Sequence, residues 1–279
     1  MGHQNVSPRV ALNFHAMPQH TFRIGASVAH RTPALTEQRF PTLQPGALFV
    51  PSATVNSPGL IPEKLVSHEI GYLGEFRAIV VTVDAKAYYD RVSDIIFQDP
   101  SPLGPPLFDG KPYSFSNLLS ATYRGFEGTL KYGWGAKSNL ILNYSRQLAS
   151  CDVSGTLREP LFMPLLQQIA ASCSSMVPRN SGSVLLMQQI TDNVQFSAGY
   201  YQQGVLQFLN TPAPLSLMRR LDLRVAKTFG RPNESGGGEV ALVVQNALRN
   251  DYTEYSPVIE SSGKIIFNRR AYLMATLGF

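Results

Sequence analysis

The chain has 279 residues, of which 44% are hydrophobic, 10% aromatic and only 15% charged, against roughly 25% charged in an ordinary soluble domain. With 15 Phe and 12 Tyr it can bury too much apolar surface to be disordered, and it contains no run of about 18 apolar residues that would form a membrane helix. The net charge of +5 is spread along the chain, which argues against nucleic-acid binding.

Apolar and polar residues alternate with a period of two along most of the chain. The last segment shows this best, because every second residue from Ala271 to Phe279 is apolar. Residues 79–90 and 220–229 repeat the pattern, and their polar positions are expected to face a water-filled lumen: Asp84, Lys86, Arg220, Asp222 and Arg224. Such alternation is typical of strands with one apolar and one polar face, in a soluble β-sandwich or in a membrane β-barrel.

The connections between strands favour the membrane barrel. About eleven strand-length segments follow one another, and no shift in composition marks a domain boundary. Short connections at 17–20, 75–77, 135–137, 191–193 and 230–238 alternate with long ones at 32–65, 98–114, 151–180, 209–218 and 249–267. Outer-membrane barrels have short turns on one side and long loops on the other. We therefore expect an all-β fold, a transmembrane antiparallel barrel segment, with a soluble β-sandwich binding module as the alternative.

Aromatic residues lie near both ends of the expected strands, as in the girdles of membrane barrels. Those at the short-connection end are Phe14, Phe22, Phe76, Tyr132, Trp134, Phe196, Phe229 and Phe279. Those at the long-connection end are Tyr89, Phe97, Phe115, Phe208 and Phe267. Because aromatic residues also favour strands in general, the girdle supports the barrel without deciding it.

Cys151 and Cys173 bracket one long connection, in which residues 160–171 have the pattern of a short amphipathic helix. We predict that the two cysteines form a disulfide, with two inert thiols as the alternative, since their spacing excludes a CxxC redox or zinc motif. The chain also lacks a GxSxG elbow, a phosphate-binding loop and an HExxH pair. We expect no catalytic residue, no cofactor and no metal site.

Four motifs in the chain match one family in the order in which that family has them. Arg31-Thr32-Pro33 with Glu37 is similar to an RTPxLxE signature, although His30 stands where the family usually has an aromatic residue. Residues 60–72 fit the pattern LxPExxxSxExGY, and Asn117 with residues 124–127 fits N…RGxE. Residues 244–248 with Tyr252 resemble the penultimate strand, and the chain ends on an aromatic residue. The chain thus resembles the C-terminal half of the barrel of TonB-dependent outer-membrane receptors.

This resemblance implies a larger architecture than the chain supplies. Such receptors have a barrel of roughly 22 strands with a plugged lumen, so residues 1–279 would be the C-terminal part of the barrel, without the plug domain and the TonB-coupling segment. It also implies a truncated or partial gene product of the outer membrane of a Gram-negative bacterium, although residues 1–16 do not have the pattern of a secretory signal. The alternative in the same membrane is a small autonomous barrel that acts as a passive channel.

The implied function is energised uptake of a metal chelate, most often an iron–siderophore complex, while haem and cobalamin stay open. The implied partners are outer-membrane lipid, the barrel assembly machinery, the TonB protein and the chelate. An anionic chelate would favour basic groups in the long loops and upper lumen. Candidate ligand-binding residues are Arg31, Glu37, Arg39, Lys64, Lys111, Tyr113 and Arg158, with solvated loop charges as the alternative. The resemblance also implies a C-terminal assembly signal that includes Leu273, Leu277 and Phe279.

Overall fold

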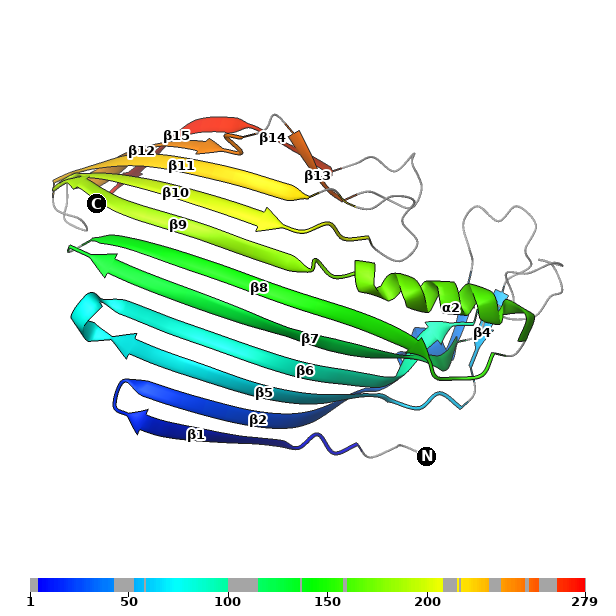
Figure 1. The fold of residues 1–279 in the computed structure, drawn as a ribbon. Helices are drawn as coiled ribbons and strands as arrows, with labels where there is room; N and C mark the ends of the chain where they lie inside the picture. The colour runs from blue at the N-terminus through cyan, green and yellow to red at the C-terminus, as the bar shows by residue number, and fades with distance from the viewer. Residues whose placement is uncertain are drawn as a thin grey trace.

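Eleven antiparallel strands form one sheet. The structure, a computed structural model of the chain, describes residues 5–42, 53–57, 59–99, 115–135, 137–157, 160–207, 215, 217–230, 237–248, 251–255 and 265–278. In order across the sheet (Figure 1), the strands are β1 (Arg9–Met17), β2 (His20–Arg31), β5 (Glu63–Phe76), β6 (Val81–Gln98), β7 (Phe115–Trp134), β8 (Ser138–Val153), β9 (Asn180–Thr191), β10 (Val194–Gln203), β11 (Met218–Phe229), β12 (Gly238–Gln245) and β15 (Arg270–Leu277). The predicted all-β fold of about eleven strands is confirmed.

The remaining elements lie in the connections. Two small hairpins pair β3 (Arg39–Thr42) with β4 (Ala53–Asn56) and β13 (Asp251–Tyr255) with β14 (Ile265–Asn268). The helices are α1 (Leu35–Gln38), α2 (Met163–Ser172) and the 3₁₀ turns η1 (Arg77–Ile79), η3 (Pro160–Phe162) and η4 (Cys173–Ser175). Apart from η1, they all belong to the long connections, which leave one end of the sheet, here the loop end, while short turns occupy the other, the turn end (Figure 1). In the part of the chain that the structure describes, no helix is both long and apolar enough to cross a membrane.

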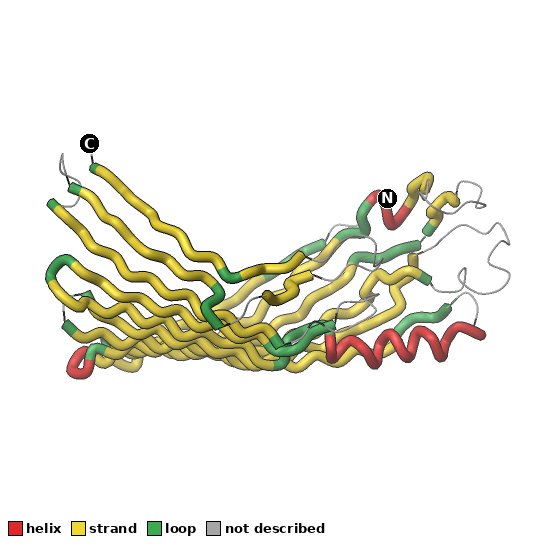
Figure 2. The backbone as a smooth tube through the Cα atoms, turned by 90° about the horizontal axis from the view of Figure 1, so that it is seen from above, coloured by secondary structure: helices red, strands yellow, loops and turns green. Residues whose placement is uncertain are grey.

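The sheet is curled into an open trough with two separate edges (Figure 2). Since it is a single sheet and not two sheets packed face to face, a β-sandwich is excluded. Every residue of the edge strands β1 and β15 is exposed. Because eleven antiparallel strands alternate in direction, the two edge strands run the same way.

The convex face of the trough is apolar. Polar side chains line the hollow inside the trough, so alternation puts the apolar side chains outside. On one half of the sheet the strand register makes Leu12, Ile24, Ile70, Ala87 and Phe126 successive neighbours on β1, β2, β5, β6 and β7. On the other half, Leu186, Ala198, Leu223, Val244 and Ala271 continue the same face. A continuous apolar outer surface of this kind suits contact with lipid.

Aromatic residues gather at the turn end of this face and again about half-way along its strands. At the turn end, Phe22 lies 5.1 Å from Tyr72 and Tyr132 lies 5.4 Å from Trp134, measured between ring centroids. Half-way along β6, β7 and β8 lie Tyr89, Phe126 and Tyr144, and the rings of Phe126 and Tyr144 are 5.6 Å apart. Phe97 does not belong to this second group, because it packs against the buried cluster beside α2.

A compact buried cluster lies at the loop end and fixes α2. Leu118 and Leu166 are fully buried there, next to Leu119, Leu157 and Ala170. Strand β8 pairs with β9 only as far as Arg146, and α2 packs on the part of β8 that extends beyond it. A helix placed in this way protects a strand that has lost its neighbour.

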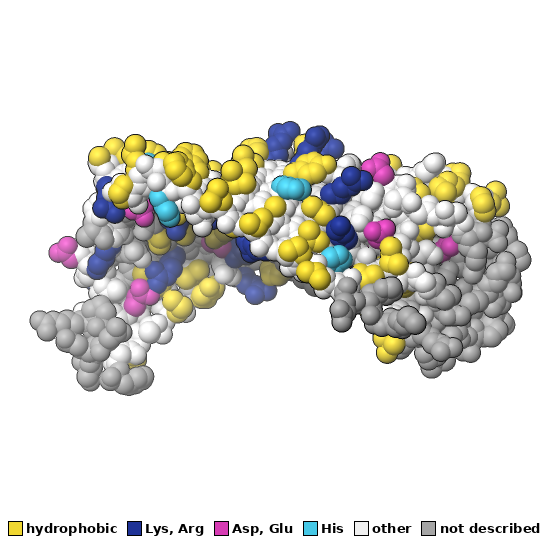
Figure 3. Space-filling view, turned by 90° about the horizontal axis from the view of Figure 1, so that it is seen from below, with side chains coloured by type: hydrophobic (Ala, Val, Ile, Leu, Met, Phe, Trp, Pro, Cys, Tyr) yellow, Lys and Arg dark blue, Asp and Glu magenta, His cyan; other side chains and the backbone are white. Residues whose placement is uncertain are grey.

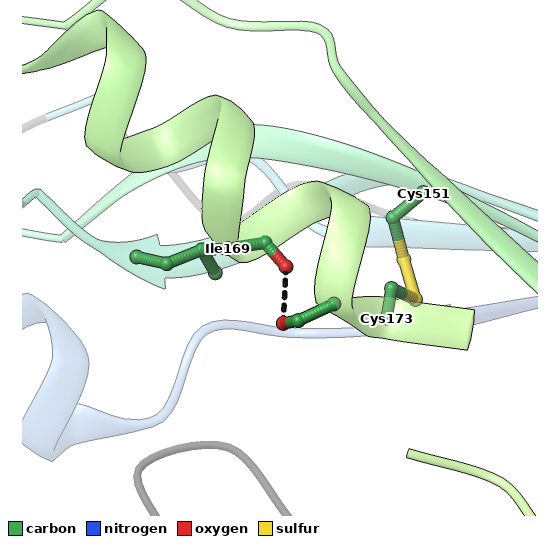
Figure 4. The surroundings of a disulfide bond; sticks show 4 residues. Cys151, Ile169 and Cys173 are labelled. Carbon is green, nitrogen blue, oxygen red and sulfur yellow. Dashed lines mark hydrogen bonds between the residues drawn. A yellow bond between two sulfur atoms is a disulfide. The ribbon is translucent and has the colours of Figure 1, made fainter. Parts of the chain in front are cut away.

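A disulfide ties the end of α2 to β8. Cys151 on β8 is bonded to Cys173, the first residue of η4, with 5.8 Å between their Cα atoms (Figure 4). In the same turn, the Ser172 hydroxyl donates a hydrogen bond to the Ile169 carbonyl at 2.7 Å. Removing this cross-link, which spans 22 residues, would raise the entropy of the unfolded chain. In the loop-closure model the free energy of unfolding then falls by about 3 kcal/mol.

The apolar assignment of the convex face predicts the effect of a charge placed there. Leu223 lies near the middle of β11 on this face, so Leu223→Arg would put a charge into hydrocarbon at a cost of about 2–4 kcal/mol. In the protein as the cell produces it, with both sheet edges completed, we expect the variant to lose its folded, protease-resistant form in outer-membrane fractions. The matched control is Ser183→Arg, which points into the polar hollow and should assemble normally. Equal assembly of both variants would contradict the assignment.

Candidate functional site

The concave face of the sheet is polar and hollow. Its central hollow has a volume of about 570 Å³ and is open on one side. The side chains that line it include Arg23, Asp84, Lys86, Glu127, Thr129, Asn143, Ser145, Ser181, Ser183, Tyr201 and Gln203. Hydrogen bonds run across the lining, from the Thr129 hydroxyl to Asn143 at 2.8 Å and from the Asn143 amide to Ser183 at 3.0 Å. The surface can therefore hold water and polar groups over several adjacent strands.

Ion pairs connect the strands beneath this hollow. Arg23 on β2 donates a hydrogen bond to Asp84 on β6 at 3.0 Å, and Lys86 on β6 lies 2.6 Å from Glu127 on β7. All four side chains stay between about one third and one half exposed, so solvent reaches them. A part-exposed pair contributes little stability. These pairs mainly arrange the charges of both signs on the polar wall.

The pair between Arg23 and Asp84 depends on a glycine. Gly71 on β5 lies opposite Arg23 in the register, between β2 and β6. A Cβ atom at Gly71 would be only 2.6 Å from Nε of Arg23. The missing side chain lets Arg23 pass over β5 and reach Asp84 on the next strand.

A second group of charges lies on the concave face of β11 and β12. Arg220 contacts Asp222 at 2.6 Å, and Arg224 is paired with Glu239 on β12. Asp222 also accepts a hydrogen bond from the backbone N–H of Asn246 at 2.9 Å. The five residues expected on the lumen side, Asp84, Lys86, Arg220, Asp222 and Arg224, all lie on this face. Of their partners, Glu127 was noted from the sequence only as the last residue of the RGxE motif, and Glu239 was not singled out, although both fall on polar positions of their alternating strands.

At the loop end, Arg31 joins two acidic residues. Its Nε and Nη2 atoms donate to Glu63 at 2.7 and 2.6 Å, and its Nη1 atom donates to Glu37 at 3.0 Å. Glu63 also accepts from the backbone N–H of Ile96 at 2.8 Å. Burial alone would raise the pKa of Glu63, but the hydrogen bonds from Arg31 and Ile96 outweigh it and hold that pKa below its usual value. We call Arg31, Glu37 and Glu63 the loop-end junction.

Asn117 extends this junction to β7. Its side-chain oxygen accepts from the Ile61 N–H at 3.1 Å, and its amide donates to the Ile61 carbonyl at 3.0 Å. The same amide donates to the Asp94 carbonyl at 2.5 Å. The side chain of Asn117 thus bonds the backbone of Ile61 as a paired strand would, at a place before β5 begins. An amide suits this position because it can donate and accept hydrogen bonds at the same time.

The candidate ligand residues do not form one site. Arg31 and Glu37 are bonded to each other in the loop-end junction. Lys64 lies on the convex face, because it shares the even-numbered positions of β5 with Ile70 and Tyr72, so we drop it from the ligand candidates. Arg39 begins β3, but its side chain is outside the described residues, as are Lys111, Tyr113 and Arg158. Among the residues that the structure does describe, no group of His, Cys, Asp or Glu is placed to hold a metal ion.

The expected assembly signal is described only in part. Leu273 and Leu277 lie exposed on the convex face of β15, at 75% and 58% exposure, whereas Phe279 is outside the described residues. Their position on an edge strand is compatible with recognition by another protein, and the signal stays a prediction.

Comparison with known proteins identifies the family. A family profile described as "TonB dependent receptor-like, beta-barrel" matches residues 1–256. The chain belongs to this family. TonB-dependent receptors are transporters and not enzymes, in agreement with the sequence prediction, and their barrels lie in the outer membrane of Gram-negative bacteria. The convex face of this TonB-dependent receptor segment is accordingly its lipid-facing surface.

Solved receptors have the same fold as this barrel segment. The ferric-catecholate import receptor Fiu of Escherichia coli K12 matches with a TM-score of 0.66 at 16% identity, over 96% of this chain and 34% of that receptor. The ferric enterobactin receptor PfeA of Pseudomonas aeruginosa, at 15% identity, and the siderophore receptor PirA of Acinetobacter baumannii, at 16%, both match with a TM-score of 0.67, over 97% of this chain and 40% of theirs.

A curated relative is similar over a shorter stretch. The vitamin B12 transporter BtuB of Vibrio vulnificus is 36% identical over 78 residues, which is 28% of this chain and 11% of the transporter. This TonB-dependent receptor segment therefore spans about two fifths or less of the proteins it matches.

The loop-end junction predicts the effect of removing its arginine. Arg31→Gln would leave Glu37 and Glu63 without their shared cation. Because Arg31 is 46% exposed, we expect the loss to be about 1 kcal/mol, or roughly fivefold faster protease cleavage of the connection between β2 and β5. Cleavage can be followed on intact outer membranes. The control is Arg77→Gln, which affects only an exposed 3.7 Å pair with Glu75 at the turn end. Equal cleavage of the Arg31 variant and the unchanged protein would refute this role.

Proposed function

We propose that this chain forms part of the wall of an outer-membrane receptor that imports an iron–siderophore complex, with energy supplied through the TonB protein. The observation that carries the proposal is the concave face, where five ion pairs line the sheet: Arg9–Glu69, Arg23–Asp84, Lys86–Glu127, Arg220–Asp222 and Arg224–Glu239. A wall with charges of both signs suits a polar cargo, whereas a dry core could not hold it. The solved receptors with this fold, by their names, bind ferric catecholates, enterobactin and other siderophores.

The exposed ion pairs also suggest how an anionic chelate would be held. Arg23 and Lys86 are 38% and 32% exposed on the hollow, and their partners are carboxylates. A ferric chelate that carries negative charge can replace Asp84 or Glu127 as the counter-ion without leaving either cation unpaired. Such an exchange costs little free energy at an exposed surface, since each ion pair there contributes no more than about 1 kcal/mol of stability. The cargo can therefore be bound and released.

Cobalamin is the second candidate cargo, because the similar transporter BtuB is named for vitamin B12. Cyanocobalamin carries no net charge and has no need of lumen cations. The two cargoes therefore differ in how strongly their uptake should depend on Arg23 and Lys86.

Uptake by cells tests the cargo. In the receptor as the cell produces it, the double change Arg23→Gln with Lys86→Gln should lower radio-iron uptake from an anionic ferric triscatecholate several-fold. Cyanocobalamin uptake, followed with radio-cobalt, should not respond, and an uncoupler should stop the iron uptake. The control is Lys131→Gln, a cation on the same face near the turn end. If the unchanged receptor takes up only cobalamin, or if the double variant imports the ferric chelate normally, the proposal fails.

We also propose that the sheet is completed by further barrel strands of the same receptor, with a plug in the lumen. The edge strands β1 and β15 run in the same direction, so they cannot pair directly in an antiparallel barrel. An odd number of further strands is needed between them. Unpaired backbone groups at a lipid-exposed edge each cost several kcal/mol, which makes completion a condition for stability in the membrane.

The isolated chain distinguishes completion from the autonomous channel. Expressed alone with an export signal, these 279 residues should give no heat-modifiable, protease-resistant species, because both edges stay open. Co-expression with the remaining barrel strands and the plug of a related receptor serves as the comparison. A resistant band from the chain alone would instead support a small autonomous barrel.

A further inference from the structure

Four basic residues form a diagonal row on the convex face, one on each of four neighbouring strands. They are Lys64 on β5, Arg91 on β6, Arg124 on β7 and Arg146 on β8. Each is offset by two positions from its neighbour in the register, since Arg91 is opposite Val66 and Thr122, and Arg124 is opposite Leu148. Diagonal neighbours of this kind have Cβ atoms about 7–8 Å apart. Figure 3 shows Lys and Arg side chains gathered on the outer surface between hydrophobic side chains and the loop end.

This basic row has no acidic partner within the described part of the chain. All four side chains are exposed, and the ion pairs of the described residues involve none of them. Two acidic residues lie near this face of β5 to β8. Asp152 lies six positions beyond Arg146 on β8. Asp94 lies in the irregular part of β6 and accepts a hydrogen bond from the hydroxyl of Ser93, the residue opposite Lys64. On the concave face, by contrast, Arg23 and Lys86 have carboxylate partners. Within the described residues no ion pair neutralises Arg91, Arg124 or Arg146, so an anion from the surroundings can pair with them.

The row lies at the height where the outer leaflet has its headgroups. Arg91 is ten residues beyond the start of β6, Arg124 is ten before the end of β7, and Arg146 is eight beyond the start of β8, while Lys64, twelve before the end of β5, lies higher. For the three arginines the height above the turn end follows from the strand tilt. With strands tilted by about 40°, eight to ten residues rise roughly 20–26 Å above the turn end, and the apolar band of such barrels is about 25 Å tall. Exposed Tyr89, at 49%, stands beside the row, as interfacial aromatic residues do.

An apolar trough begins directly below the row on the same strands. It has a volume of about 480 Å³ and is lined by Phe22, Ile24, Ile70, Tyr72, Ala85, Ala87 and Phe126. Its floor is β6, where the small side chains of Ala85 and Ala87 lie next to Tyr72 and Ile70 on β5. On β7, Phe126 lies opposite Ala87, and Gly128, opposite Ala85, adds no side chain. Ala87 is followed on this face by Tyr89 and then by Arg91. The trough therefore leads from the middle of the lipid-facing surface to the basic row.

We propose that this surface is a binding site for one phosphate-bearing lipid of net negative charge in the outer leaflet, with its phosphate on the basic row and an acyl chain in the trough. Arginine suits phosphate because its planar guanidinium can donate two parallel hydrogen bonds. The trough faces hydrocarbon in the assembled receptor, so the occupant must be amphipathic. This also accounts for His68, which interrupts the apolar positions of β5 beside Tyr89 and lies at the level of the headgroups. The proposal rests on the outer-membrane location and not on the cargo.

Brominated lipids measure this preference through a tryptophan. The chain has one tryptophan, Trp134, on the same strand and face at the turn end. In a receptor whose tryptophans outside these 279 residues are changed to Phe, the reporter variant carries Phe126→Trp and Trp134→Phe. It is purified from outer membranes and reconstituted into phosphatidylcholine vesicles that contain brominated phosphatidylglycerol or brominated phosphatidylcholine. We expect the anionic lipid to quench the reporter with at least fivefold higher relative affinity. Adding Arg91→Gln and Arg124→Gln should remove most of this preference, since each cation is worth about fivefold.

Three controls separate the lipid site from other causes. Lys131→Gln removes a cation from the opposite face of β7 and should change nothing. Ala87→Phe fills the trough without a change of charge and should lower the preference, whereas Ala198→Phe on β10 should not. The unchanged protein, read through Trp134, should show no preference for the anionic lipid. Inorganic phosphate should compete no better than chloride at equal ionic strength.

The proposal is overturned if the reporter shows no preference, if the arginine variants keep it, or if free phosphate abolishes it. A second measurement covers variants that assemble poorly in vesicles. Phosphorus-containing lipid that co-purifies with the receptor from outer membranes is quantified by mass spectrometry per mole of protein. The double arginine variant should retain less of it than Lys131→Gln, and equal amounts would also refute the site.

Discussion

The need to satisfy every backbone hydrogen bond inside a membrane governs this structure. In hydrocarbon no water can replace a missing partner, so each strand must have a neighbour on both sides. The nine inner strands of the sheet meet this condition through antiparallel pairing, while β1 and β15 each have one free side. Where β8 outlasts β9, the chain covers the exposed part with α2 and anchors the helix through Cys151 and Cys173. The same condition makes the two outer edges the places where further strands would attach under the proposal of a completed barrel.

A period of two was enough to predict the strands and most of their faces. Arg220, Asp222 and Arg224 alternate with apolar residues, and the register places them on one side of β11, the concave one. The register places Lys64 on the convex side instead, because its neighbour Glu63 occupies the concave position and a shift of one residue reverses the face. Pairing is harder to predict, since Arg224 meets Glu239 through a register between two strands. Phe97 was misplaced because the sequence does not show where a connection folds back over a strand end.

The motifs that revealed the family hold the sheet together at the loop end. Arg31 and Glu37 come from one motif, Glu63 from the next and Asn117 from a third, and the structure joins them through hydrogen bonds across three strands. Their charges are therefore already satisfied when a cargo arrives. Under the proposed function, recognition of a particular chelate would depend on other residues, in the hollow and in the long connections, which do not have this structural task. This explains why the sequence indicates the family more clearly than the cargo.

The two faces of one strand show how environment selects the partner of a charge. On β7, Glu127 points into the polar hollow on the concave face and is paired with Lys86. Arg124, three residues earlier, points outward from the convex face, and no ion pair involves it among the described residues. In the lumen, an unpaired charge would attract or repel every charged cargo strongly. The ion pairs on the concave face weaken this net electrostatic interaction. At the membrane rim, an internal acid would compete with lipid phosphate for the same arginine. Under the two proposals above, ion pairs on the concave face would let a cargo be released. Arginines without ion pairs on the convex face would bind lipid headgroups and so hold the barrel at one depth in the membrane.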